Sequence, residues 1–129
     1  MNTNATSPSL MVEEDFLPDA AALFFHLRET IHWDESLGAR KTASFGVPYN
    51  YARMEYDSVP FTHELLAVAE RLASRLGIGF NNCLLNFYES GANTMGFHSD
   101  ETTHLIPGTG VAIVSLGSPH TLTFRLKRD

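Results

Sequence analysis

The chain has 129 residues, of which 43% are hydrophobic and 19% charged, and its formal net charge is −6. This composition is typical of a globular protein with a substantial core, and the negative charge argues against a broad phosphate-binding surface. No apolar run approaches the ~20 residues of a membrane span, and the amino terminus lacks the pattern of a signal peptide. We therefore expect a cytoplasmic protein without membrane contact. Residues 1–9 are small and polar, which predicts a disordered tail before one domain at 10–129.

Two amphipathic helices are predicted in the first part of this domain. The first should begin at Pro18–Asp19, because apolar residues then recur on one helix face. The second should cover Pro60–Leu76, with Gly77 as its stop signal. The apolar face of the first helix consists of Leu23, Leu27 and Ile31, and that of the second consists of Leu65, Val68, Leu72 and Leu76.

The segment between the two helices mixes aromatic and cationic side chains. It runs from Arg40 to Tyr56 and contains three tyrosines, three cationic residues, Gly46 and Pro48. Such a mixture suits a flap that stacks on bases and contacts phosphates. An irregular hairpin with its tyrosines on the face of a sheet explains the same pattern, and both interpretations stay open here.

A His-x-Asp pair follows a short apolar strand. Cys83–Leu85 is expected to be that strand, and it delivers Asn86 and Tyr88 to its end. In an extended segment His98 and Asp100 point the same way, so both can reach one metal ion. An imidazole nitrogen and a carboxylate oxygen suit ferrous iron, which requires a further protein ligand in the arrangement of two histidines and one carboxylate. The Asn86 amide and the Tyr88 hydroxyl would then lie beside the ion as donors for a small carboxylate.

The carboxyl-terminal part is expected to form strands joined by glycine turns. Val111–Leu116 should be a buried strand, and Thr121–Lys127 should be a second strand after a turn at residues 117–120. Two helices followed by such strands indicate an α+β fold, with a β-sandwich or jelly roll and the helices packed on one face.

Several of these segments together resemble the AlkB-like branch of the iron(II)/2-oxoglutarate dioxygenases. The resemblance covers roughly residues 38–128 and is far more specific than a lone His-x-Asp. It rests on Arg40-Lys41-Thr42, Phe45-Gly46, Phe80-Asn81, Leu84-Leu85-Asn86-x-Tyr88, Gly91, Met95-Gly96-x-His98-Ser99-Asp100-Glu101, Ala112-x-x-Ser115-Leu116-Gly117 and Thr123-Phe124-Arg125.

The resemblance implies a double-stranded β-helix that binds Fe(II), 2-oxoglutarate and O2, with no catalytic side chain beyond the metal centre. His98 and Asp100 would be metal ligands, and Asn86 and Tyr88 would bind 2-oxoglutarate. The substrate side is expected to include Arg40 near a phosphate, Tyr49 or Tyr51 near the base, and Glu101.

The chain departs from the family's pattern at two places. The family's second histidine ligand, and the arginine that binds 2-oxoglutarate, lie several strands beyond the pair. His104 and His120 do not match that position, so the third metal ligand stays unidentified, and we expect a jelly roll that is incomplete at its carboxyl terminus. Thr102 stands where near relatives that act on alkylated DNA usually carry an acidic residue.

The implied reaction is oxidative removal of N-linked alkyl groups from nucleic acid bases, a form of DNA repair that releases aldehyde, succinate and CO2. Its partner would be alkylated single- or double-stranded nucleic acid, bound by a monomer. The same fold acting on RNA, a protein or a small molecule is an alternative, favoured by the negative net charge and Thr102. A truncated remnant without catalysis is another, favoured by the missing histidine and arginine.

Overall fold

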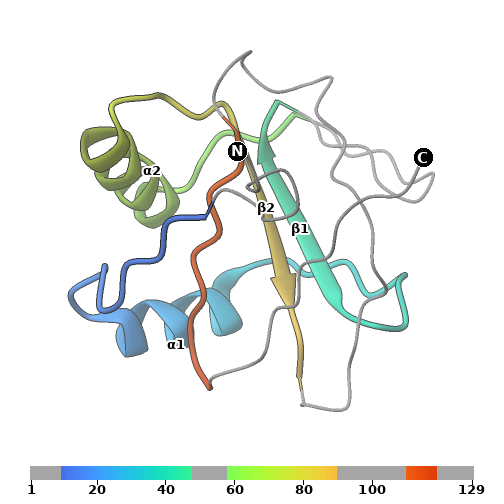
Figure 1. Cartoon of the computed structure of the whole chain (residues 1–129). Coiled ribbons are helices and arrows are strands. Elements are labelled where there is room, and N and C mark those ends of the chain that lie inside the picture. Colours follow the sequence, from blue (N-terminus) through green and yellow to red (C-terminus); the bar gives the residue numbers. More distant parts are fainter. Residues whose placement is uncertain (1–9, 48–57, 90–109, 119–129) are drawn as a thin grey trace, which may run out of the picture.

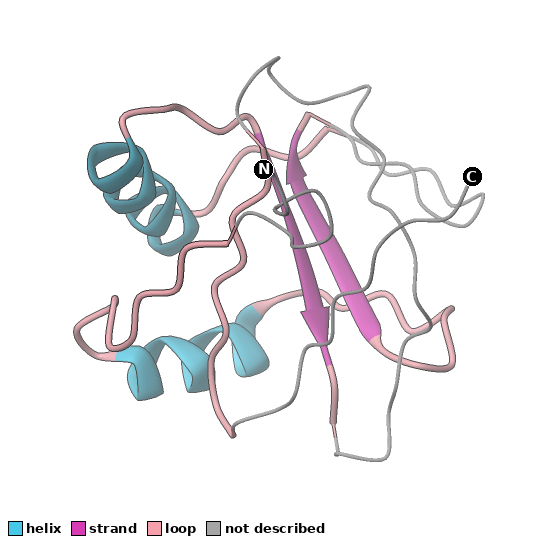
Figure 2. Ribbon diagram, viewed as in Figure 1, coloured by secondary structure: helices cyan, strands magenta, loops and turns pink. Residues whose placement is uncertain are grey.

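The computed structural model of the chain describes residues 10–47, 58–89 and 110–118. Within these ranges the element order is α1 (Ala20–Thr30), β1 (Lys41–Gly46), α2 (His63–Leu76) and β2 (Asn82–Phe87). The two strands pair as an antiparallel sheet, and both helices lie on the same side of it (Figure 1). Figure 2 shows the same α+β arrangement by type of element. In the described part of the chain, neither helix is long and apolar enough to cross a membrane.

Helix α1 confirms the first predicted helix, and it begins at Ala20, directly after the predicted start at Pro18–Asp19. The Asp19 carbonyl accepts a hydrogen bond from the Leu23 amide at 3.1 Å, which begins the intrahelical ladder. The helix ends where Ile31 turns to an extended conformation with ψ 139°. Leu27 is buried, and Leu23 and Ile31 pack beside it, so the predicted stripe is the face that enters the core.

Helix α2 begins at His63, three residues after the predicted start at Pro60. The reason is a capping interaction, because the Thr62 hydroxyl accepts a hydrogen bond from the Leu65 amide at 3.2 Å. Gly77 ends the helix in the left-handed conformation, at φ 74°, as the sequence predicted. Of the predicted apolar stripe, Leu65 is the one buried residue.

Strand β1 bears on the two interpretations left open for the segment Arg40–Tyr56. Lys41–Gly46 is a regular strand with four successive buried residues, so the first part of that segment is sheet and not an exposed flap. Local composition suggested a flap because it does not reveal pairing with a strand far along the chain. Tyr49 and Tyr51 lie outside the described residues, and so do the predicted tail and the strand at 121–127.

The sheet register determines which side chains share a face. Strand β2 contains the predicted strand Cys83–Leu85, and its Asn86 pairs with Thr42 while Leu85 pairs with Ala43. Because side chains alternate along a strand, Ala43, Phe45 and Leu85 lie on one face and Thr42 and Asn86 on the other. The first face packs on the helices, forming a core with Leu27 and Leu65.

Gly46 ends β1 where the chain passes close to its neighbours. It has φ 79°, and a Cβ placed there would overlap the Asn81 carbonyl oxygen and approach the Phe61 ring to 2.6 Å. Glycine is therefore required both by the backbone conformation and by space.

The segment 110–116 does not form the strand predicted for Val111–Leu116. It forms no backbone hydrogen-bond ladder with another described strand. Val111 and Ile113 are 55% and 60% exposed. Exposure alternates along the segment, so that Leu116 reaches the core while its neighbours face outward. An apolar run indicates a buried strand only when another strand pairs with it and both faces are covered.

Candidate functional site

The face of the sheet turned away from the helices carries polar side chains that are nevertheless buried. Arg40 is 6% exposed, Thr42 1% and Ser44 7%. Such residues are usually at the surface, so their burial on one face needs an explanation other than a hydrophobic core. Buried polar side chains are normally hydrogen-bonded, and a few convergent polar groups are also a feature of ligand-binding sites.

The Ser44 hydroxyl is buried on this face without a hydrogen-bond partner among the described residues. It is the one buried side-chain oxygen or nitrogen in the described part of the chain that has no hydrogen-bond partner. Ser44 lies two residues from Thr42, which pairs with Asn86, and its side chain is therefore on the same face as the Asn86 amide. A buried hydroxyl without a partner costs free energy unless a ligand supplies one.

Asn86 is held by a hydrogen bond from Arg40. The Arg40 Nε donates to the Asn86 Oδ1 at 2.7 Å, across 46 residues of sequence. Both residues lie at the end of the sheet where β1 begins and β2 ends, the lower end of the strands in Figure 1. The structure therefore places the predicted co-substrate residue beside a buried cation.

Tyr88 follows β2 directly and is two residues beyond Asn86. It is 37% exposed. The predicted pair of donors, an amide and a phenol, is thus present at one end of the sheet. This composition fits a small carboxylate, whose oxygens accept hydrogen bonds.

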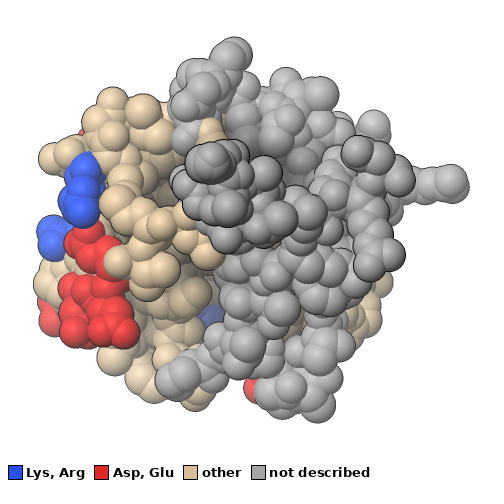
Figure 3. Space-filling view, viewed as in Figure 1, with Lys and Arg blue, Asp and Glu red and all other residues tan. Residues whose placement is uncertain are grey.

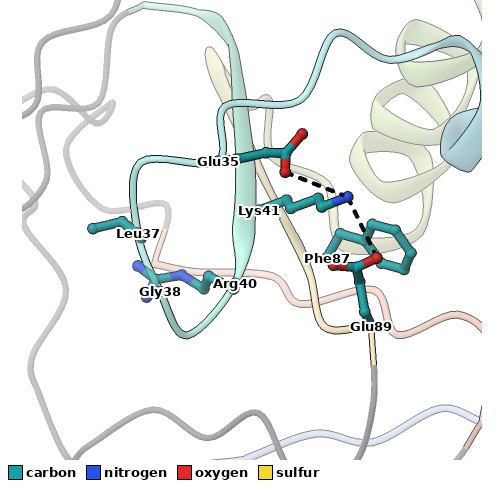
Figure 4. Close-up of a pocket in the computed structure, with 7 residues that line it drawn as sticks. All are labelled: Glu35, Leu37, Gly38, Arg40, Lys41, Phe87 and Glu89. Atoms are coloured by element: carbon teal, nitrogen blue, oxygen red, sulfur yellow. Dashed lines mark ion pairs between the residues drawn. The ribbon is translucent and has the colours of Figure 1, made fainter.

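A pocket lies beside this end of the sheet, and Figure 4 shows its lining. Lys41 and Arg40 are consecutive residues that point in opposite directions, as alternation along a strand requires. The Lys41 ammonium lies 3.4 Å from a Glu89 carboxylate oxygen and 3.8 Å from one of Glu35. It also lies 6.0 Å from the centre of the Phe87 ring. Its charge is therefore compensated by the protein.

The phosphate contact of Arg40 stays a prediction. The structure gives its Nε a protein partner and leaves little of its side chain exposed. On the face shown in Figure 3, acidic side chains group on the helix side with cationic ones beside them, and no broad basic surface is visible among the described residues.

The predicted metal ligands His98 and Asp100 lie outside the described residues, and Glu101 does too. Within the ranges that the structure describes, no three His, Cys, Asp or Glu side chains converge as a metal site would require. The metal part of the site therefore stays a prediction from the sequence. The roles of Asn86 and Tyr88 toward a co-substrate stay predictions as well.

Two residues of the polar face were missed by sequence reasoning, Thr42 and Ser44. A signal for them existed, because in the run from Arg40 to Phe45 polar residues at 40, 42 and 44 alternate with apolar residues at 43 and 45. This period of two is typical of a strand with two different faces. The mixed composition of the longer segment obscured it.

Comparison with known proteins adds an independent finding. A family model described as 2OG-Fe(II) oxygenase superfamily matches residues 20–129. The DNA oxidative demethylase ALKBH2 of Mus musculus is 32% identical over 91 residues, which make up 68% of this chain and 38% of that protein. The alpha-ketoglutarate-dependent dioxygenase alkB homolog 3 of Homo sapiens is 30% identical over 103 residues, 78% of this chain and 35% of that protein. The chain thus spans less than two fifths of the length of these relatives.

Proposed function

The chain belongs to the 2OG-Fe(II) oxygenase superfamily, and from that premise we propose that it is an AlkB-like dioxygenase acting on alkylated nucleic acid. Its reaction would remove N-linked alkyl groups from bases and release aldehyde, succinate and CO2. The name of the relative ALKBH2, a DNA oxidative demethylase, supports this substrate class. We further propose that the two-stranded sheet is part of the family's double-stranded β-helix.

The observation that carries the proposal is the buried polar face of the sheet. Arg40, Thr42 and Ser44 are almost fully buried there, and Asn86 lies on the same face at its end. If this face of the sheet only packed against a hydrophobic core, apolar residues would be expected at these positions. The unpartnered Ser44 hydroxyl adds a polar atom that a bound ligand can satisfy.

Each group at the site has a role in this proposal. His98 and Asp100 hold Fe(II), and Asn86 and Tyr88 donate hydrogen bonds to 2-oxoglutarate. When bound, the metal, co-substrate and O2 supply the oxidising chemistry, while the protein orients the reactants and excludes water. Tyr49, Tyr51 and Glu101 are the candidates for contact with the base.

A different substrate is the second candidate function. The net charge is −6, and the Lys41 ammonium is paired with two carboxylates, so the described surface offers little attraction for phosphates. The same centre would then hydroxylate a substrate without phosphates, a protein or a small molecule. Substrate comparison separates this possibility from DNA repair.

The test begins with binding and continues with turnover. Calorimetry would measure 2-oxoglutarate affinity with Mn(II) in place of Fe(II), and succinate release would be followed with methylated and unmethylated oligonucleotides. His98→Ala should abolish metal-dependent 2-oxoglutarate binding, whereas His32→Ala, at an exposed position, should not. Equal succinate release with both oligonucleotides would count against base dealkylation, and absent binding would refute the site.

A further inference from the structure

The hydrogen bond between Arg40 and Asn86 fixes the orientation of the Asn86 amide. A guanidinium carries donors only, so the amide atom that faces the Arg40 Nε at 2.7 Å must be the oxygen. The amide nitrogen, which carries two N–H donors, is then turned away from the guanidinium. No described residue accepts a hydrogen bond from that nitrogen.

We propose that Arg40 is a positioning residue that presents the Asn86 N–H donors to the carboxylate of 2-oxoglutarate. This inference rests on the proposed function, because it needs a carboxylate in front of Asn86. The opposite amide orientation would direct a carbonyl oxygen at the carboxylate, which would repel it. By accepting from a cation, the amide carbonyl also polarises its own N–H groups and makes them stronger donors.

The sheet explains why Arg40 can hold this position. Thr42 pairs directly with Asn86, and Arg40 lies two residues before Thr42 on the same face. Diagonal neighbours on paired strands are about 7–8 Å apart, a separation that a long side chain can bridge. Arg40 is 6% exposed, so the surrounding protein restricts its rotamers and holds the guanidinium against the amide.

The experiment is a double-mutant cycle that reads 2-oxoglutarate affinity in the Mn(II)-loaded protein. Arg40→Met removes the donor but keeps a long apolar stem for the buried position. It should weaken 2-oxoglutarate about tenfold, as expected for a hydrogen bond to a charged group, while Mn(II) affinity changes less than about twofold. In an Asn86→Ala background the same change should have less than about a twofold effect, because Arg40 then has no amide to orient.

Two further variants separate orientation from structure. Arg40→Lys also presents donors only, so it should keep the amide oxygen facing it and retain affinity within about threefold. Lys41→Met removes the neighbouring cation on the other face of the sheet and should leave 2-oxoglutarate affinity unchanged. A loss in Arg40→Lys as large as in Arg40→Met would overturn the orientation argument.

A ligand-free measurement tests the amide directly. Nitrogen-15 relaxation should show a rigid Asn86 side-chain amide in the wild-type chain and a mobile one in Arg40→Met. Equal mobility in both proteins, or a tenfold weakening by Arg40→Met that persists in the Asn86→Ala background, would overturn the role of Arg40. If the wild-type chain bound no 2-oxoglutarate at all, the proposed function itself would fail.

Discussion

Asn86→Ala should destabilise the protein because it deprives a buried cation of one hydrogen-bond acceptor. The Arg40 guanidinium is 6% exposed, and its Nε–H bond to Asn86 is short at 2.7 Å. Leaving a buried donor without this partner costs about 1–3 kcal/mol, and a charged donor belongs in the upper part of that range. We therefore expect a loss of about 2 kcal/mol in the free energy of unfolding, or roughly 6–10 °C in Tm for a chain of this size.

Removing the cation as well should recover most of that loss. In Asn86→Ala/Arg40→Met the buried cation and its exposed amide partner are both replaced by apolar groups, and removing both partners of a hydrogen bond in this way is close to neutral. Urea unfolding of the wild type, both single variants and the double variant would measure the coupling, which we expect to exceed about 1 kcal/mol. Additive losses, or an Asn86→Ala variant as stable as the wild type, would refute the assignment of Asn86 as the partner of a buried charge.

Four other predictions concern the scaffold of the site. Gly46→Ala should cost about 2–4 kcal/mol in unfolding free energy because it combines positive φ with overlap on Asn81, whereas Gly38→Ala, with nothing within 4 Å, should be neutral. Burial raises the pKa of the Cys83 thiol from 9.0 to about 11, so at pH 8 its alkylation should be about a hundredfold slower in the folded chain than in urea. Stability should also fall as the pH rises from 9.0 towards 11, because the unfolded thiol releases its proton first; a flat profile would contradict the burial of Cys83. Thr62→Ala should lower the free energy of unfolding by about 1 kcal/mol, and Thr62→Ser should not; equal losses in both variants would rule out the capping role.

The helices and the strand before the site could be predicted from the sequence. Pro18 and Asp19, the spacing of Leu23, Leu27 and Ile31, and the stop at Gly77 act over a few residues, so the sequence displays them directly. The strand that carries Asn86 was also predicted, because a short apolar run followed by polar residues is a local pattern, while the roles of Asn86 and Tyr88 stay predictions. The start of α2 was missed by three residues because Thr62 competes with Pro60 as the first helical signal.

Only the tertiary structure decided which strands pair and which side chains form hydrogen bonds over long distances in sequence. The segment Lys41–Gly46 became a buried strand because β2 pairs with it, and the apolar residues 111–116 form no strand because no described strand pairs with them. The bond between Arg40 and Asn86 joins residues 46 positions apart, and sequence reasoning expected Arg40 at a phosphate. Local patterns specify helices, turns and the chemistry of single side chains, whereas strand partners, burial and the orientation of an amide depend on contacts between distant segments.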